Sequence, residues 1–254
     1  MILACDIGNT NAKFAVFENS KRISFNIFSS NNIAYNLFDK YKISHAAVSS
    51  VVPDKTKELT KYLQSELQIN PLIIDINSKF NLSINYRTPE TLGIDRICAA
   101  EGAYKLFTED YTVPNEFEKF YLMVIDFGTA TTLNFINYKS EFEGGIILPG
   151  IKMMINSLNT STAQLPRIDL TNYTSFIGKD TRSSIASGIL NSSVSLIEKA
   201  HHYLKYTAGA DTIKIFLTGG NASVVQPFIR FENTLVEDLV LQGVKTVFER
   251  NKID

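Results

Sequence analysis

The chain opens with M-I-L-A-C-D-I-G-N-T-N-A-K-F-A-V-F (residues 1–17), and this stretch decides how the rest is interpreted. Ile2–Ile7 and Ala12–Phe17 are apolar runs with strand character, so they predict two strands joined at a corner. An ordinary hairpin turn needs only a pair such as Asn-Gly or Asp-Gly. The corner here is longer and more polar, and it contains a carboxylate at Asp6 and a glycine at Gly8. We therefore expect this corner to bind a ligand.

The same corner occurs again later in the chain. Aligned on their aspartates, C-D-I-G-N-T-N-A-K-F-A-V-F and I-D-F-G-T-A-T-T-L-N-F-I share a strand, Asp, any residue, Gly, small polar residues and a second strand. Asp6 corresponds to Asp126, and Gly8 to Gly128. This weak internal duplication predicts two similar domains that each contribute one corner to a shared site.

The other predicted elements fit a chain of alternating strands and helices. Further strands are expected at Ile23–Phe28, Ala46–Val51, Leu72–Ile76, Tyr121–Asp126, Thr131–Ile136, Phe142–Leu148 and Ile213–Thr218. Helices are expected at Asp54–Leu67, Thr91–Phe107, Ser183–Tyr206 and Asp238–Phe248. The polar, acidic segment Thr108–Lys119 contains Pro114 and is the best candidate for a domain junction, which predicts domains at 1–114 and 115–254.

Composition and charge narrow the class of protein. The 254 residues are 44% hydrophobic and 20% charged, as in ordinary globular proteins. A formal net charge of −1 gives no electrostatic footprint for nucleic acid or an anionic membrane. The N-terminus has no basic targeting region, and no run approaches the ~20 apolar residues of a membrane span. We expect a cytoplasmic protein with Cys5 and Cys98 as buried, reduced thiols.

The two corners have the chemistry of a phosphate site. Small residues let backbone N–H groups approach a ligand closely, and Thr and Asn side chains add donors for phosphate oxygens. A carboxylate beside phosphate makes sense only with a cation between them, and Mg²⁺ is the usual mediator. Lys13 could balance a terminal phosphate, and the glycine pair Gly219-Gly220 after a strand could admit a base or ribose. Neither G-x-x-x-x-G-K-[ST] nor G-x-G-x-x-G is present.

The strand order, the duplicated corners and the later Gly-Gly turn resemble the actin, hexokinase and Hsp70 superfamily of ATP-binding folds. The chain is most similar to type III pantothenate kinases, over essentially its whole length. Six motifs carry this resemblance: D-I-G-N-T-N-A-K (6–13), N-Y-R-T-P-E-T-L-G-I-D-R (85–96), D-F-G-T-A-T-T (126–132), E-G-G-I-I-L-P-G (143–150), G-K-D-T-R-S-S-I-A-S-G (178–188) and L-T-G-G-N-A (217–222). Any one motif is moderately specific, and all six in order form a strong signal.

The resemblance implies an α/β fold of two duplicated ribonuclease-H-like (actin/hexokinase-type) domains with an ATP cleft between them. It implies ATP-dependent phosphorylation of pantothenate to 4′-phosphopantothenate, the first step of coenzyme A synthesis, by a homodimer. Asp95 would be the catalytic base. The residues expected at ATP are Asp6, Ile7, Gly8, Asn9, Thr10, Asn11, Ala12, Lys13, Thr129, Gly219 and Gly220. Those expected at pantothenate are Tyr86, Gly93, Ile94, Asp95, Arg96 and Thr181. Asp126 would bind a monovalent cation (K⁺ or NH₄⁺), and Asp6 would hold Mg²⁺ directly or through water.

The chemistry of the acceptor motif agrees with these roles. An alcohol that attacks a γ-phosphoryl group needs a carboxylate to orient it and accept its proton, and Asp95 lies near a helix start. Arg96 can pair with a carboxylate in bidentate geometry. Each of these residues also has a structural interpretation, as a helix-terminal carboxylate or a surface arginine. Two other functions remain open: a non-catalytic transcription accessory factor of the same fold, and a kinase for another small hydroxylated metabolite.

Overall fold

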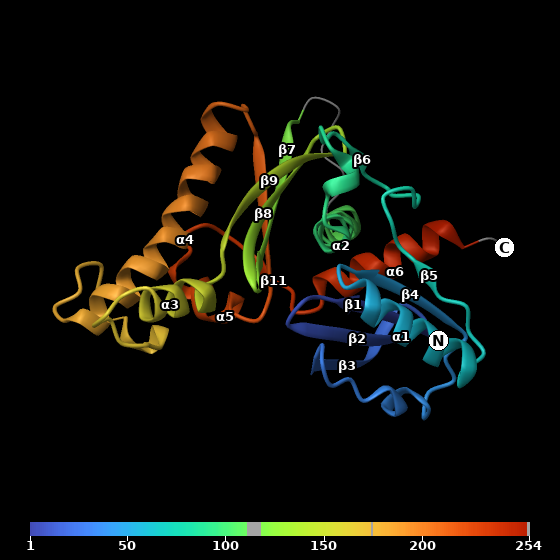
Figure 1. Cartoon of the computed structure of the whole chain (residues 1–254). Coiled ribbons are helices and arrows are strands. Elements are labelled where there is room, and N and C mark those ends of the chain that lie inside the picture. The colour runs from blue at the N-terminus through green and yellow to red at the C-terminus, as the bar shows by residue number, and fades with distance from the viewer. Residues whose placement is uncertain (111–117, 174, 253–254) are drawn as a thin grey trace. The chain divides into compact units, whose positions relative to one another are not determined.

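The computed structural model describes residues 1–110, 118–173 and 175–252, and they form two compact units (Figure 1). The first unit contains the described residues of Met1–Val113, Lys139–Gly144 and Asp238–Asp254, and the second those of Pro114–Tyr138 and Gly145–Glu237. Most of the expected junction Thr108–Lys119 lies outside the described residues. Domains at 1–114 and 115–254 remain a prediction, and the units differ from them because two later segments group with the first unit.

The sheet of the first unit has its opening strand at the centre. The strands are β1 (Ile2–Ile7), β2 (Asn11–Glu18), β3 (Lys21–Ser29), β4 (His45–Ser50) and β5 (Leu72–Ile73), in the order β3-β2-β1-β4-β5. β1 is antiparallel to β2 and parallel to β4. All five strands were expected, although β5 is shorter than the predicted Leu72–Ile76.

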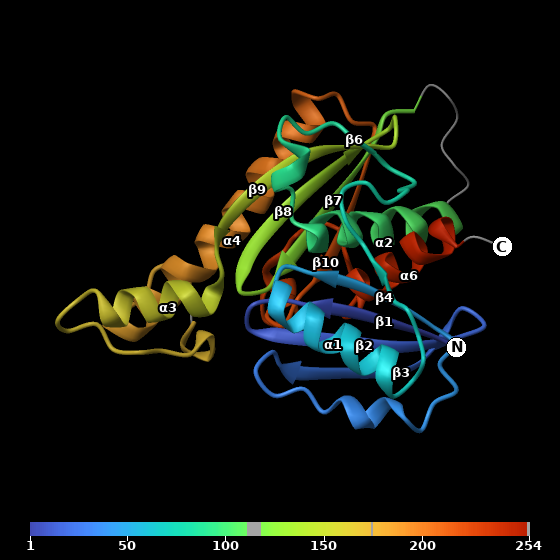
Figure 2. The ribbon, with the colours of Figure 1, turned by 45° about the vertical axis from the view of Figure 1, so that its right-hand side comes forward.

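Helices cover both faces of this sheet (Figure 2). The other elements of the first unit are η1 (Tyr35–Phe38), α1 (Pro53–Ser65), β6 (Ser83–Ile84), η2 (Pro89–Thr91), α2 (Ile94–Asp110) and α6 (Leu239–Asn251). Leu59 and Leu63 of α1 join the apolar core on one face. On the other face, the ring of Phe248 in α6 lies 5.4 Å from the ring of His45 in β4.

Helix α6 is fixed to the first unit along its whole length. The guanidinium of Arg22 lies 2.9 Å from the carboxylate of Asp238, just before α6. At the other end, Asn251 donates to the carbonyl of Lys79 at 2.8 Å. Between them Gly243 packs directly on α2, because a Cβ at Gly243 would lie 1.7 Å from the carbonyl oxygen of Cys98.

The second unit repeats the strand order of the first. Its strands are β7 (Phe120–Phe127), β8 (Ala130–Asn137), β9 (Glu141–Pro149), β10 (Thr212–Thr218) and β11 (Thr234–Leu235), in the order β9-β8-β7-β10-β11. The first residues of β9 belong to the first unit, where they pair with β6. As in the first sheet, the central strand β7 is antiparallel to the strand that follows it and parallel to β10. This repeat confirms the duplication predicted from the two corners.

The helical elements of the second unit are α3 (Ile151–Thr160), η3 (Leu170–Asn172), α4 (Thr181–Tyr206), α5 (Ala222–Val225) and η4 (Gln226–Phe228). α4 was expected, and α3 and α5 were not. Met123 and Ile125 of β7 form the core of this unit with Ile189 and Ile197 of α4.

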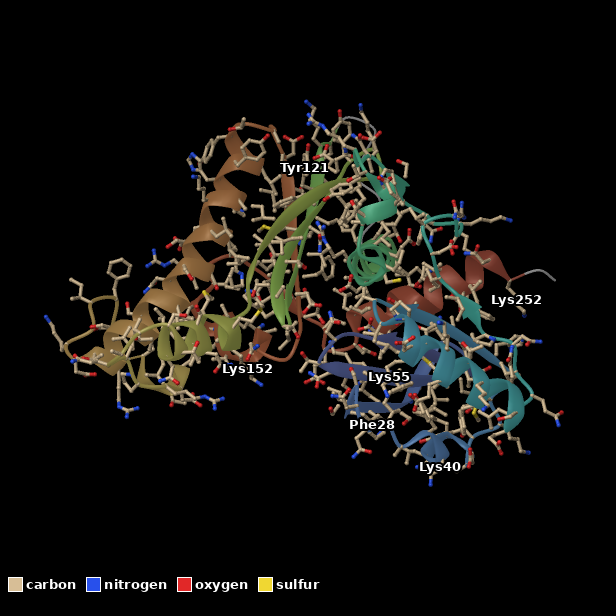
Figure 3. The ribbon with its side chains drawn as sticks, in the orientation of Figure 1. Phe28, Lys40, Lys55, Tyr121, Lys152 and Lys252 are labelled. Atoms are coloured by element: carbon tan, nitrogen blue, oxygen red, sulfur yellow. The ribbon has the colours of Figure 1, made fainter. Side chains whose placement is uncertain are left out.

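Charged side chains extend from both units. Lys40 and Lys152 are exposed, and Figure 3 shows such charged side chains extending from the ribbon of each unit. Within the residues that the structure describes, no helix is both long and apolar enough to cross a membrane.

Candidate active site

The first corner places a buried carboxylate at the end of the central strand. Asp6 is the next-to-last residue of β1 and is only 9% exposed. The hydroxyl of Ser49, its neighbour on β4, donates to Asp6 Oδ1 at 3.4 Å. Lys13 is the cross-strand partner of Asp6 on β2, so an acidic and a basic residue lie opposite each other at this end of the sheet.

The turn of this corner is tighter than the sequence suggests. Ile7 pairs with Ala12, and the N–H of Gly8 donates to the carbonyl of Asn11 at 3.0 Å. Only Asn9 and Thr10 therefore form the tip, and both are exposed. The expectation of a long corner was wrong. The polar residues are exposed around a short turn, while Ile7 and Ala12 are buried and present only their backbone.

The second corner repeats this geometry in the second unit. Asp126 is the next-to-last residue of β7, with Thr132 opposite it on β8 and Thr218 beside it on the parallel strand β10. The hydroxyl-bearing Thr218 therefore occupies the register that Ser49 has beside Asp6. The loop of this corner contains Gly128 and the exposed Thr129.

Two further motifs pack on the second corner. Gly219 has φ +94°, which favours glycine, and a Cβ there would lie 2.3 Å from Asp126 Oδ1. A Cβ at Gly150 would lie 2.1 Å from the carbonyl oxygen of Thr129. Asn221 also donates to the carbonyl of Phe127, from its backbone N–H and its side-chain amide, at 3.2 Å each. The structure thus brings together D-F-G-T-A-T-T, L-P-G and T-G-G-N around Asp126.

Sequence reasoning identified Gly219 but did not single out Gly150 or Asn221. Both residues lie within motifs that the sequence analysis recognised, at 143–150 and 217–222. Their place in these motifs was the signal that could have identified them. Gly220 differs from its neighbour because a Cβ there would meet nothing within 4 Å. Space is therefore open beside the Gly-Gly turn, as contact with a flat base or ribose would require.

The acceptor motif lies at the start of α2 in the first unit. The N–H of Arg96 donates both to the Gly93 carbonyl at 3.1 Å and to Asp95 Oδ1 at 2.9 Å. The Asp95 carboxylate is thereby held against the first turn of α2. Asp95 itself is half-buried.

Arg96 lies against two aromatic rings. Its guanidinium carbon is 5.9 Å from the ring centroid of Tyr86 and 5.7 Å from that of Phe142, and the two rings meet edge to face at 6.3 Å. Arg96 is 8% exposed. Gly144, with φ +108°, lets the Tyr86 ring approach, since a Cβ there would be 3.1 Å from it. Tyr86 and Arg96 were expected, whereas Phe142 and Gly144 were missed because only tertiary pairing reveals them.

Thr181 belongs to the second unit, unlike the rest of the predicted acceptor residues. It is the first residue of α4 and is exposed. Asp180 caps this helix in a capping box with Ser183, and the hydrogen bond from the Ser183 N–H lowers the pKa of Asp180. Thr181 therefore has a well-defined backbone position.

Carboxylates are sparse at both corners. Among residues 1–110, 118–173 and 175–252, no three His, Cys, Asp or Glu side chains gather as a metal cluster. A single carboxylate suits a cation that is held mainly by water and phosphate oxygens. At Asp126 the fit is supported by Gly219, because any side chain there would fill the space beside the carboxylate. Cys5 and Cys98 are buried free thiols, as expected.

Comparisons with known proteins agree with the geometry. A model of type III pantothenate kinases matches residues 2–202. Curated type III pantothenate kinases from a Sulfurihydrogenibium species and from Persephonella marina are 31% and 32% identical, and the alignments cover 96% and 98% of this chain and 98% of each relative. One from Syntrophus aciditrophicus is 30% identical over 99% of this chain and 100% of that protein.

Solved structures support the fold. A Campylobacter jejuni protein described as a Baf family transcriptional activator has a TM-score of 0.63 at 22% identity, over 98% of both chains. A Listeria monocytogenes protein described as an N-acetylmannosamine kinase has a TM-score of 0.50 at 12% identity, over 99% of both chains. These likenesses show an actin/hexokinase-type fold. By the family match and these full-length relatives, the chain belongs to the type III pantothenate kinase family.

Proposed function

We propose that the chain transfers the γ-phosphoryl group of ATP to the primary hydroxyl of pantothenate, the first step of coenzyme A synthesis. Membership of the family supports this activity. The observation that carries it at the level of residues is the acceptor cluster, in which Asp95 is held beside Arg96 and Arg96 lies against the rings of Tyr86 and Phe142.

The acceptor cluster matches the chemistry of pantothenate. Arg96 pairs with the acceptor carboxylate, for which its planar guanidinium is suited. The aromatic rings of Tyr86 and Phe142 cover the apolar part of the substrate. Asp95 orients the primary hydroxyl and takes its proton as the phosphoryl group is transferred. Gly93, just before α2, and Ile94, its first residue, are assigned to the pantothenate site, and Thr181 is assigned a further contact with pantothenate.

The two corners are assigned to ATP. In the first, the backbone from Asp6 to Lys13 contacts the phosphates, and Lys13 balances their charge. In the second, Thr129 contacts ATP, and Gly219 and Gly220 admit the nucleoside. Asp6 is the residue that would hold Mg²⁺, directly or through water, and Asp126 would hold K⁺ or NH₄⁺. Bound there, these cations would offset phosphate charge. We further propose a cytoplasmic homodimer that binds no nucleic acid or membrane.

The test is ADP production by purified protein with ATP, Mg²⁺ and a panel of hydroxylated acids, with and without K⁺. We expect turnover with pantothenate and stimulation by K⁺. Turnover only with another acceptor, or none from folded protein, would contradict the proposal. The likeness to a protein described as a transcriptional activator shows the fold alone, and the same assay separates that alternative.

A substitution of the proposed base isolates its role. Asp95→Asn keeps the size of the side chain but removes the proton acceptor, so kcat should fall about 10²–10⁴-fold. ADP binding measured by calorimetry should stay unchanged. Glu109→Gln is the matched control, because Glu109 is an exposed carboxylate at the far end of the same helix, paired with Lys105 at 3.1 Å. An active Asp95→Asn enzyme would remove Asp95 from the role of base.

A further inference from the structure

Helix α2 contains a buried carboxylate that no motif explains. Glu101 is fully buried and lies further along the helix that begins with Asp95 and Arg96. Burying a carboxylate costs free energy unless hydrogen bonds compensate for the lost water. Its hydrogen-bond partners therefore indicate what it holds in place.

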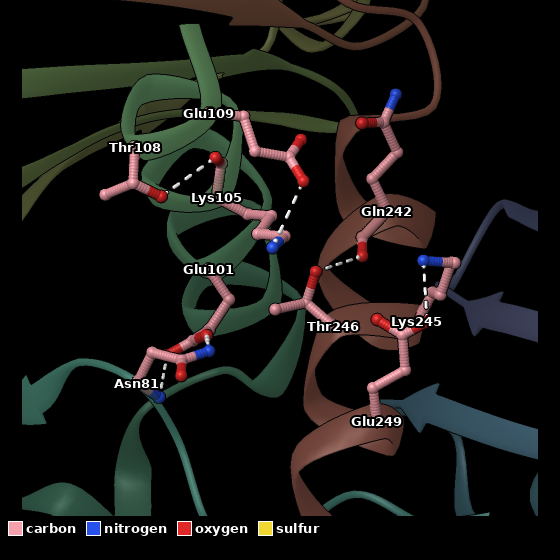
Figure 4. Close-up of polar contacts among 9 residues, drawn as sticks. All are labelled: Asn81, Glu101, Lys105, Thr108, Glu109, Gln242, Lys245, Thr246 and Glu249. Carbon is pink, nitrogen blue, oxygen red and sulfur yellow. Dashed lines mark hydrogen bonds and ion pairs between the residues drawn. The ribbon is translucent and has the colours of Figure 1, made fainter. Parts of the chain in front are cut away.

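Among the residues that the structure describes, the hydrogen-bond donors to Glu101 come from one segment, Asn81–Leu82. Glu101 Oε1 accepts the N–H groups of Asn81 and Leu82 at 2.7 and 2.8 Å, and Oε2 accepts from the Asn81 side-chain amide at 2.8 Å. Figure 4 shows Asn81 against Glu101. Burial raises the pKa of Glu101, and these hydrogen bonds oppose that rise. The segment continues directly into β6 (Ser83–Ile84) and then to Tyr86.

A second side chain of α2 holds the partner of this segment. The hydroxyl of Tyr104 lies 2.7 Å from the hydroxyl of Ser140, at the turn before β9. The carbonyl of Ser140 accepts the N–H of Ser83 at 3.0 Å, and the carbonyl of Phe142 accepts the N–H of Asn85 at 3.0 Å. Glu101 and Tyr104 thus hold the two strands of one ribbon, which ends at Tyr86 and Phe142.

We propose that Glu101 and Tyr104 are positioning residues that set the aromatic wall of the acceptor site relative to Arg96. One helix provides Arg96 and Asp95 at its start and fixes the ribbon that presents Tyr86 and Phe142. The distances from Arg96 to the two rings therefore depend on Glu101 and Tyr104. This inference rests on the proposed function, since the acceptor enclosed by the wall is pantothenate.

A pocket beside these residues does not explain why the Glu101 carboxylate is buried. It measures about 310 Å³ and is lined by Asn81, Tyr104, Lys105, Thr108, Thr246, Glu249 and Arg250. Its lysine and its glutamate are already paired, Lys105 with Glu109 at 3.1 Å and Glu249 with Lys245 at 2.8 Å. The hydrogen bonds of Glu101 point to the ribbon, not to a ligand in this pocket.

The test compares Glu101→Ala, Glu101→Gln and Tyr104→Phe with the control Glu109→Gln. Alanine removes all three contacts. Glutamine can keep its oxygen on the N–H groups of Asn81 and Leu82, while the Asn81 amide turns to accept from the new amide. Tyr104→Phe removes one hydroxyl and keeps the ring. The control changes an exposed carboxylate of the same helix.

Two measurements decide the outcome. In hydrogen exchange, Glu101→Ala should speed exchange of the Asn81 and Leu82 amides by about 10-fold or more, since hydrogen bonds to a charged acceptor are lost. In kinetics, the same variant should raise KM for pantothenate by about 10-fold and change KM for ATP less than about 2-fold. Glu101→Gln should recover most of both effects. Tyr104→Phe should raise KM for pantothenate in the same selective way.

Other results overturn the inference. A rise in both KM values together, or a loss of thermal stability with unchanged KM, would give Glu101 a purely structural role. If Glu101→Ala does not fold, an unchanged KM for pantothenate in Tyr104→Phe would count against the inference. Wild-type protein without pantothenate turnover would overturn the proposed function as well. Normal wild-type turnover with unselective variants would overturn only the positioning role.

Discussion

Alanine at Gly219 is expected to damage the second corner and its unit together. The residue has φ +94°, and an added Cβ would lie 2.3 Å from Asp126 Oδ1 and 2.6 Å from the backbone N and C of Phe127. The carboxylate could rotate away, but the backbone of the central strand β7 has no such freedom. Relief of the clash therefore requires a movement of the turn or of the corner itself.

The magnitude follows from three terms. A non-glycine residue in left-handed backbone costs about 1–2 kcal/mol. Overpacking against fixed atoms costs about 1–3 kcal/mol. Alanine also lowers the conformational entropy of the unfolded chain, which stabilises the folded protein by about 0.4–1 kcal/mol. The net loss is about 3 kcal/mol, which corresponds to a fall in Tm of about 6–12 °C for a cooperative unit of about 150–250 residues, roughly the length of the whole chain, and to a larger fall if the second unit unfolds by itself.

Gly220→Ala is the matched control, because it changes the adjacent residue and its Cβ would meet nothing within 4 Å. Differential scanning fluorimetry of both variants should show a large fall in Tm for Gly219→Ala and little change for Gly220→Ala. Hydrogen exchange should place the loosened amides in β7 and β10. Equal Tm values for the two variants would refute the reasoning, since the two adjacent sites differ in the positive φ of Gly219 and in the atoms that the added Cβ would meet.

Three other predictions concern helix packing, thiols and pH. Gly243→Ala should lower Tm by several degrees because its Cβ would lie 1.7 Å from the Cys98 carbonyl, whereas Gly188→Ala in α4 meets no atom within 4 Å and should raise Tm slightly. Burial raises the pKa of the Cys5 and Cys98 thiols, so a thiol reagent at pH 8 should modify neither until the protein is unfolded; rapid labelling of native protein would contradict this. Burial lowers the pKa of His201 from 6.5, so the unfolded chain binds this proton more readily than the folded protein between the two pKa values. The free energy of unfolding should therefore rise as pH increases from the lowered pKa to 6.5. Urea titrations should show this rise in the wild type and not in His201→Gln, and parallel pH profiles of the two proteins would exclude the effect.

Much of the fold could be predicted because local patterns agree with it. Both central strands are apolar runs that end in Asp-x-Gly, and the structure gives them the same neighbours. Helix α3 (Ile151–Thr160) escaped prediction although Ile151, Met154, Ile155 and Leu158 follow helical spacing, because it is only 10 residues long and its N-cap Gly150 has no capping side chain. The placement of α6 in the first unit also escaped, since packing on α2 is a tertiary contact that chain order does not indicate.

In the candidate site too, local motifs could be predicted from the sequence and tertiary contacts could not. Asp6, Asp126 and Asp95 each lie two residues from a glycine in a short motif, so local sequence was enough to select them as candidates. Phe142 faces Arg96 only because β6 pairs with β9, far away in the chain. Glu101 carries no local signal at all. Its role depends on a segment that approaches α2 in three dimensions.

The late position of α6 has a consequence for how the protein is made. Synthesis at roughly 5–20 residues per second puts on the order of 10 s between the end of α2 at Asp110 and the start of α6 at Leu239. During that interval the nascent first unit lacks the helix that covers Cys98 and Gly102, and the strands β7 to β11 are synthesised before α6 begins. The unit that begins the chain is thus the last to close. A chain that stalls before α6 would leave the surface of α2 that α6 normally covers exposed to solvent. We expect such an incomplete chain to aggregate more readily than the full-length protein.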